Sequence, residues 1–121
     1  MLTLHEVLSD FGEYAGCNAD AALTVDSRSL SGESPLHWMS TLGDHVAIDL
    51  LARAGADLNA QDKSGNAPIH AACASKQATA VRALIDAGAN PHLENGAGLT
   101  ALEVATQQGY RPCIELLAGK L

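Results

Sequence analysis

Aromatic residues are scarce in this 121-residue sequence, at 3% of the chain, although hydrophobic residues together make up 47%. A core of ordinary size therefore has to be built from alanine, leucine, valine and isoleucine. Such small aliphatic side chains suit closely packed helices better than facing β-sheets, which favour aromatic and β-branched residues. The length and composition predict one domain of helical class.

Cysteine is also rare. The three cysteines, Cys17, Cys73 and Cys113, are odd in number and share no C-x-x-C spacing. This pattern argues against both a disulfide framework and a zinc site, and it fits a reducing compartment. We therefore expect no metal, no cofactor and a cytoplasmic location.

Long apolar runs are absent as well. No stretch approaches the ~18 consecutive apolar residues that a membrane-spanning helix needs. The N-terminal stretch MLTLHEVLSDFGEY has no basic region and no apolar core followed by a cleavage site. We therefore expect neither a membrane span nor a secretory signal.

Basic residues number only 7 against 14 acidic ones, so the formal net charge is −7. The imbalance is concentrated in residues 1–33, where six acidic residues against one arginine leave −5. A negative field repels phosphates, which makes nucleic acid and anionic membranes poor partners. It would attract and steer a basic protein, although acidity of this size also serves simple solubility.

What the sequence does contain is a repeat of regular period. Related stretches begin at positions 32, 65 and 98, with the same offset between them each time: GESPLHWMSTLGDHVAIDLLARAGADLNAQD, GNAPIHAACASKQATAVRALIDAGANPHLEN and GLTALEVATQQGYRPCIELLAGKL. In this frame Pro35 aligns with Pro68, and His37 aligns with His70. Repetition at such a period is typical of solenoids, in which stacked units share one continuous core.

Each unit can be divided into elements by its turn and helix signals. Pro35 and Pro68 suit the first turn of a helix, where no hydrogen-bonded N–H is lost. Gly55 and Gly88 suit the position after a helix end, where φ is positive. Between them, HVAIDLLARA and ATAVRALIDA read as helices with a wide apolar face, and ADLNAQDKSG reads as a polar, turn-rich finger. Each unit is thus expected to run helix, turn, helix, finger.

The stretches SPLHWMSTLGD, APIHAACASKQ and LTALEVATQQG, joined by AGADLNAQDKSG and AGANPHLENGAG, resemble the G-x-T-P-L-H-x-A-A-x-x-G and G-A-D-V-N-A-x-D-x-x-G motifs of the ankyrin repeat family. The resemblance implies an all-α solenoid of about three helix-turn-helix units with short hairpin-like fingers. The single domain, 1–121, would comprise a degenerate N-terminal cap at 1–28, repeats at 29–61 and 62–94, and a C-terminal capping repeat at 95–121. A capping box in TLHE predicts a helix over Thr3–Tyr14.

We expect no enzymatic activity. The sequence has no G-x-S-x-G elbow and no dinucleotide fingerprint, and no set of nucleophile, base and orienting group can be assembled from it. In ankyrin-like repeats the histidine matched by His37 and His70 organises a loop through backbone hydrogen bonds, so we expect a structural role for both. Cys73 and Cys113 fall on core-facing positions, and Cys17 falls in a loop.

The resemblance also implies a partner-binding face, because ankyrin-like domains bind with their fingers and first helices. Carried over by position, the candidates form one set in each unit. They are Leu30, Ser31, Glu33, Thr41 and Leu42, then Lys63, Ser64, Asn66, Ala74 and Ser75, then Gly96, Ala97, Leu99, Gln107 and Gln108. Taken singly, each of these residues is best explained as an ordinary solvated position. As a set they are the predicted binding face, because binding residues concentrate on loops held by a rigid scaffold.

Trp38, the one tryptophan, is not explained by the repeat, since its counterparts are Ala71 and Val104. It either packs at the junction with the N-terminal cap or anchors a partner, because tryptophan is enriched among interface hot spots.

With its acidic N-terminal segment and a first repeat that opens GESPLHW, the chain resembles the small stand-alone bacterial ankyrin proteins that serve as immunity partners of secreted toxins. This resemblance implies a dedicated binder or inhibitor of one basic protein, such as a toxin or effector, that acts by occlusion and is a monomer on its own. The alternative is a general scaffold or regulatory adaptor, which links proteins without blocking an active site.

Overall fold

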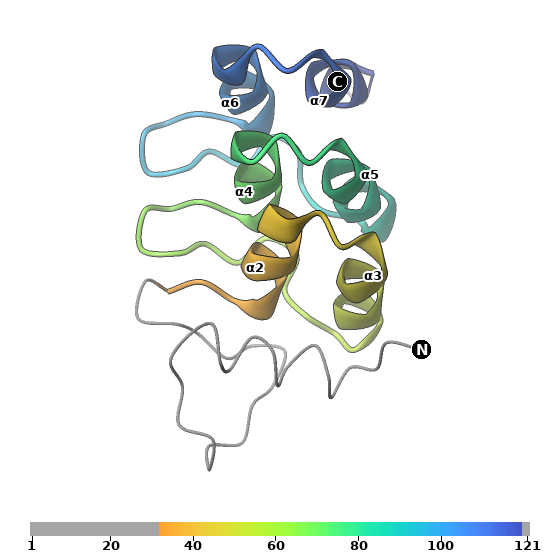
Figure 1. Cartoon of the computed structure of the whole chain (residues 1–121). Helices are drawn as coiled ribbons and strands as arrows, with labels where there is room; N and C mark the ends of the chain where they lie inside the picture. Colours follow the sequence, from red (N-terminus) through yellow and green to blue (C-terminus); the bar gives the residue numbers. More distant parts are fainter. Residues whose placement is uncertain (1–31, 120–121) are drawn as a thin grey trace.

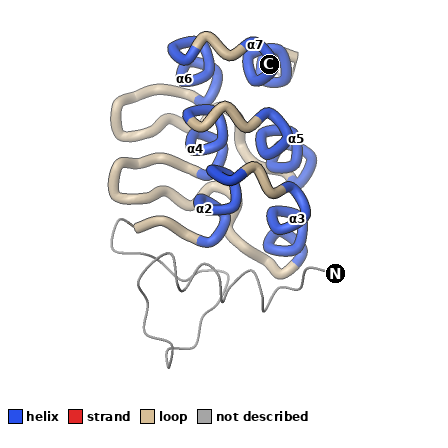
Figure 2. The backbone as a smooth tube through the Cα atoms, viewed as in Figure 1, coloured by secondary structure: helices blue, strands red, loops and turns tan. Residues whose placement is uncertain are grey.

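The computed structural model describes residues 32–119, so the helix predicted over Thr3–Tyr14 and the loop predicted around Cys17 lie outside the described residues. Within this range the chain forms six helices and no strand (Figure 2), which confirms the all-α prediction. The helices are α2 (Pro35–Leu42), α3 (His45–Arg53), α4 (Pro68–Ala74), α5 (Ala78–Ala87), α6 (Ala101–Gln108) and α7 (Arg111–Ala118).

The helices are arranged in pairs that stack one above another (Figure 1). The first helices of the pairs, α2, α4 and α6, form one layer, and the second helices, α3, α5 and α7, form another. The loops that follow α3 and α5 project from the first-helix layer as fingers (Figure 1). The predicted order of helix, turn, helix and finger is therefore the order observed. None of the helices in residues 32–119 has both the length and the apolar character that a bilayer span requires.

The first helices of the first and third described units, α2 and α6, begin after a residue whose side chain caps the helix. Ser34 caps α2, because its hydroxyl accepts a hydrogen bond from the backbone N–H of His37 at 3.4 Å, and Pro35 follows at the first helical position. In the third unit Thr100 accepts from the N–H of Glu103 at 3.3 Å, and the Glu103 carboxylate accepts from the N–H of Thr100 at 3.3 Å. This reciprocal pair is a capping box, which satisfies two N–H groups that the helix itself cannot satisfy.

Glycine supplies the left-handed backbone at the helix ends. Gly55, after α3, has a φ of +90°, and Gly88, after α5, has a φ of +107°, as the repeat predicted. A side chain built at either position would meet no atom within 4 Å. The requirement for glycine is therefore one of backbone conformation and not of space.

The core runs continuously through the described stack and is aliphatic. Its largest fully buried side chains include Leu36, Ile48, Leu51, Ile69 and Leu84. Buried alanines fill the narrower places between helices, and the buried core cluster of the described residues contains no aromatic ring. The low aromatic content of the sequence thus agrees with this close packing of helices, which leaves space for small side chains between them.

Two histidines connect successive units. The backbone N–H of Ser34 donates to Nδ1 of His37 at 3.1 Å, and Nε2–H of His37 donates to the carbonyl of Asn66 at 2.6 Å. His70 repeats the pattern, with the N–H of Ala67 at 3.1 Å and the carbonyl of Leu99 at 2.9 Å. Each ring therefore joins the start of its own helix to the finger that leads into the next unit. The loop-organising role predicted for both histidines is confirmed.

Candidate partner-binding face

Stacking converts the repeat period into columns of side chains. Thr41, Ala74 and Gln107 occupy the same position in successive first helices, which pack directly on one another. The finger tips are stacked in the same way, since the N–H of Gly96 donates to the carbonyl of Ser64 at 2.9 Å. We call the described residues of these columns the finger face: Thr41, Leu42, Lys63, Ser64, Ala74, Ser75, Gly96, Ala97, Gln107 and Gln108. Of the predicted set, Leu30 and Ser31 lie outside the described residues.

The remaining predicted column consists of Glu33, Asn66 and Leu99, and all three are half-buried. The backbone carbonyl of Asn66 accepts a hydrogen bond from His37. The side-chain oxygen of Asn66 accepts a second one from the side-chain amide of Asn95, at 3.0 Å. Leu99 packs against the core and accepts from a histidine through its carbonyl. Asn66 and Leu99 therefore hold successive units together, which leaves them less side-chain surface for a partner.

The finger face is mildly polar and has one large apolar side chain. Leu42 is 55% exposed at the end of α2, and most of the other members are small or uncharged. Lys63 supplies its charge, and a second exposed cation, Lys76, lies in the turn directly after Ser75. The turns of neighbouring units are linked, because the side-chain amide of Gln77 donates to the carbonyl of Thr41 at 3.1 Å.

Trp38 is half-buried and packs against the aliphatic core. It lies one helical turn before Leu42, so both side chains are on the same side of α2. Leu42, and not Trp38, is the more exposed large apolar side chain of this helix. The half-buried position agrees with a packing role but leaves part of the indole for contact, so both interpretations of Trp38 stay open.

The second helices carry paired charges. Arg53 with Asp49, Arg82 with Asp86 and Arg111 with Glu115 form ion pairs one turn apart on α3, α5 and α7, at 3.0, 3.9 and 3.8 Å. All six side chains are more than half exposed, so each pair contributes little to stability. Their effect is to neutralise this layer locally.

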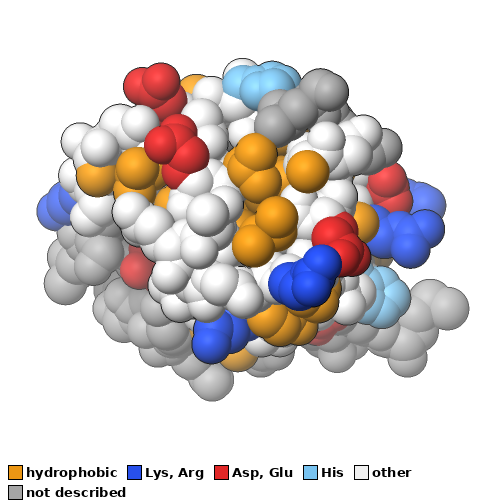
Figure 3. All heavy atoms as spheres, turned by 90° about the horizontal axis from the view of Figure 1, so that it is seen from above, with side chains coloured by type: hydrophobic (Ala, Val, Ile, Leu, Met, Phe, Trp, Pro, Cys, Tyr) orange, Lys and Arg blue, Asp and Glu red, His pale blue; other side chains and the backbone are white. Residues whose placement is uncertain are grey.

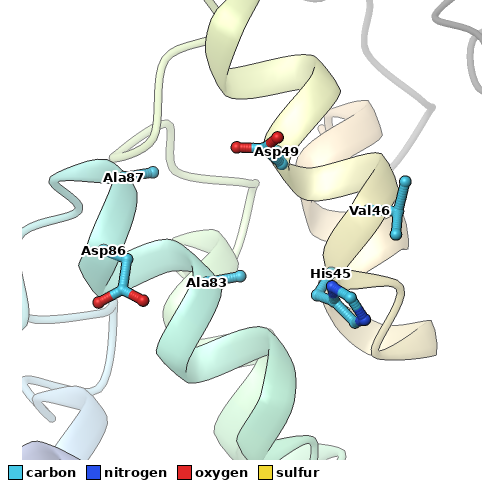
Figure 4. A pocket seen from close by; sticks show the side chains of 6 residues that line it. All are labelled: His45, Val46, Asp49, Ala83, Asp86 and Ala87. Atoms are coloured by element: carbon cyan, nitrogen blue, oxygen red, sulfur yellow. The ribbon is translucent and has the colours of Figure 1, made fainter.

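A shallow depression of about 320 Å³ lies between α3 and α5 (Figure 4). Ala83 and Ala87 point from α5 toward α3, and Asp49 and Asp86 lie on either side of the depression. The lining is completed by His45 and Val46. The sequence analysis missed this feature, for which the signal was two small residues one turn apart on α5. No group of His, Cys, Asp and Glu in residues 32–119 has an arrangement suited to a metal ion.

The third unit presents one end of the stack (Figure 3). Hydrophobic side chains lie near the middle of this end, with charged side chains around them. Relative to the second unit, Glu103 replaces His70, and Thr106 replaces Cys73. Glu103 and Thr106 are exposed where their counterparts are buried. The polar replacements allow this end to be solvated.

The described cysteines are enclosed, as predicted. Cys73 and Cys113 are fully buried. Burial, followed by interaction with Cys113, raises the pKa of Cys73 to about 12, and burial also raises the pKa of Cys113. Neither thiol is therefore available as a thiolate nucleophile near neutral pH.

Stacked helix pairs with projecting fingers define an α-helical repeat protein whose aligned fingers and first helices form one continuous exposed surface. A family model described as ankyrin repeats, in three copies, matches residues 6–95 and residues 36–120. The chain belongs to the ankyrin repeat family, and it is a protein–protein interaction module. The comparison with curated proteins gives no match.

Proposed function

We propose that this chain is a dedicated binder of one protein partner and that it inhibits this partner by covering its active site. The observation that carries the proposal is the finger face. Side chains from three successive units are aligned there on a scaffold whose fingers are joined by backbone and side-chain hydrogen bonds. Affinity benefits from such a preorganised surface, because little conformational freedom is lost on binding.

The charge of the chain supports a basic partner, such as a toxin or effector that acts on nucleic acid or membranes. Residues 1–33 carry −5 of the total net charge of −7. A field of this sign accelerates encounter with a cationic protein, and salt screens the effect over a Debye length of about 8–10 Å. We expect the association rate to fall markedly between low and physiological salt, as measured by stopped flow. A rate that does not change with salt would remove the steering role.

Affinity capture from the native host tests the proposal. The full chain should retain one partner in fixed stoichiometry, and adding the chain should inhibit that partner's activity. The variant Leu42→Asp, which places a charge in the centre of the exposed apolar contact, should lose the partner. Arg82→Gln, on the second-helix layer, is the matched control and should retain it. Capture of chaperones alone, or equal capture by both variants, would count against the proposal.

One observation favours the alternative function of a scaffold or adaptor. The depression between α3 and α5 lies on the second helices and gives the chain a second surface, separate from the finger face. An adaptor would bind two proteins at once without inhibiting either. Sedimentation of the chain with its captured proteins distinguishes the two functions, since an adaptor forms a ternary complex and an inhibitor a binary one.

A further inference from the structure

The turn between α4 and α5 carries a lysine where the other two described units carry glycine. Lys76 has a φ of +58°, and it is the one non-glycine residue in the described part of the chain with a positive φ. Its counterparts in the units before and after it are Gly43 and Gly109, with φ of +75° and +65°. A helix that ends in this conformation usually does so on glycine, because a side chain at this position is strained.

No ion pair or side-chain hydrogen bond within residues 32–119 offsets this strain. The side chain of Lys76 is exposed and takes part in no ion pair or side-chain hydrogen bond there. The backbone N–H of Lys76 donates to the carbonyl of Cys73 at 3.1 Å, a bond that glycine would make equally well. What lysine adds at this position is an ammonium group directed to the surroundings.

A second lysine of the same unit has the same character. Lys63 is exposed at the finger tip and also has no ion-pair partner in the described range. The other described cations, Arg53, Arg82 and Arg111, are all paired on the second helices. The unpaired positive charge of the described chain is therefore confined to the second unit, with Lys63 at its finger tip and Lys76 in the turn after α4.

Leu42 lies close to this charge. A Cβ atom on Gly43, the next residue, would collide with the side chain of Gln77, which follows Lys76. The turn that carries Leu42 is thus packed against the turn that carries Lys76, so the exposed apolar side chain and the cation belong to turns that are in contact.

We propose that Lys63 and Lys76 form a cationic edge of the finger face that binds carboxylate groups of a protein partner, with Leu42 as the adjoining apolar contact. The inference rests on the proposed function, to which it adds a local chemistry. The partner segment that covers the second unit is acidic, even where the partner as a whole is basic. Lys63 lies five residues before α4 and Lys76 two residues after it, so a segment that reaches both lysines has to follow the finger as well as the length of α4, which is about 10 Å.

A titration with a defined probe tests the inference without a known partner. The probe is a synthetic peptide of about twelve residues, rich in glutamate and leucine, which is long enough when extended to pass both lysines. Added to the isotope-labelled full chain, it should shift the backbone amide signals of residues 41–43, 63–64 and 74–77 in a saturable way. Lys63→Gln and Lys76→Gln should each lower the affinity for the peptide about two- to five-fold, and Lys76→Arg should retain binding.

The matched control is Arg82→Gln, which removes a cation outside the finger face and should leave the peptide affinity unchanged. Shifts that do not saturate, or an equal loss of affinity in Arg82→Gln, would overturn the proposal. Lys76→Gly should raise the urea midpoint of unfolding, because it removes the backbone strain, and it should lower the affinity for the peptide, because it removes the ammonium group. A lower midpoint would contradict the strain argument, and unchanged affinity would contradict the binding role.

These outcomes are separate from those of the proposed function. Failure to capture any partner counts against the dedicated binder, while the peptide titration still decides the chemistry of the edge. A captured partner that binds Lys63→Gln and Lys76→Gly as tightly as wild type counts against the edge alone.

Discussion

At the residue scale, the unit-to-unit connection depends on the neutral form of histidine. His70 needs an acceptor nitrogen for the N–H of Ala67 and a donor nitrogen for the carbonyl of Leu99, and neutral imidazole offers both at once. Burial lowers the pKa of His70 below its ordinary value, although the carbonyls of Leu99 and Leu93 and the charge of Asp62 act in the opposite direction. Protonation of Nδ1 would break the bond to Ala67.

The lowered pKa of His70 makes stability depend on pH. Because the folded ring is harder to protonate than the unfolded one, the unfolded chain takes up this proton first as the pH falls. The contribution of His70 is complete above the ordinary histidine pKa of about 6.5 and is lost progressively below it. We expect the urea midpoint to decrease as the pH falls from about 6.5 to 5.5, before most carboxylates titrate, and the decrease to be smaller in His70→Gln. An equal decrease in both proteins would contradict this prediction.

Sequence reasoning succeeded at residues whose role follows from position in the repeat, such as His37, His70 and Gly88. It missed Lys76, because the left-handed backbone there is set by the turn and cannot be read from a lysine. The glycines at the same position in the neighbouring units were a usable signal. Sequence reasoning named both Leu42 and Trp38 as candidates for partner contact, but it did not show that Leu42 is the more exposed of the two. Exposure depends on what packs against a side chain, and the size of a residue alone does not give that.

At the element scale, the fingers are held by very close backbone contact. Gly65 and Gly96 face one another across successive fingers, and a Cβ atom on Gly65 would overlap the backbone of Gly96. Gln61 adds side-chain bonds to the carbonyls of Gly65 and Glu94, at 2.9 and 3.0 Å. Glycine is therefore required at position 65, in the finger motif, for two reasons. The backbone has a positive φ of +78°, and a side chain would overlap the next finger.

Comparing two glycine variants separates these two reasons. Gly88→Ala introduces only the backbone strain, since there is open space around the new methyl group, and it should cost about 1–2 kcal/mol of the free energy of unfolding. Gly65→Ala introduces the same strain and an overlap with the next finger, which should cost about 1–3 kcal/mol more. Urea denaturation measures both. Equal losses would show that the fingers can separate without cost.

At the scale of the whole molecule, the regular period of the sequence was sufficient to predict the architecture. Each unit has an apolar face that a neighbour must cover, so stacking follows from the pattern of Leu51 and Leu84 and of the alanines between them. The depression between α3 and α5 did not follow, because it depends on the spacing of the helices. The boundaries proposed for the N-terminal cap and the capping repeat remain predictions.

The histidine bonds reach only from one unit to the next, and this limited reach has a mechanical consequence. Each described unit is bonded to its immediate neighbour, so force applied along the chain can release one unit while the others stay folded. Under slow stretching in optical tweezers, we expect extension in steps of about 110–120 Å, the extended length of one repeat unit. Weakening one connection with His70→Gln should lower the force of a single step and leave the step length unchanged. The protein would then respond to tension as a spring that lengthens in discrete units, and a single all-or-none release would exclude this behaviour.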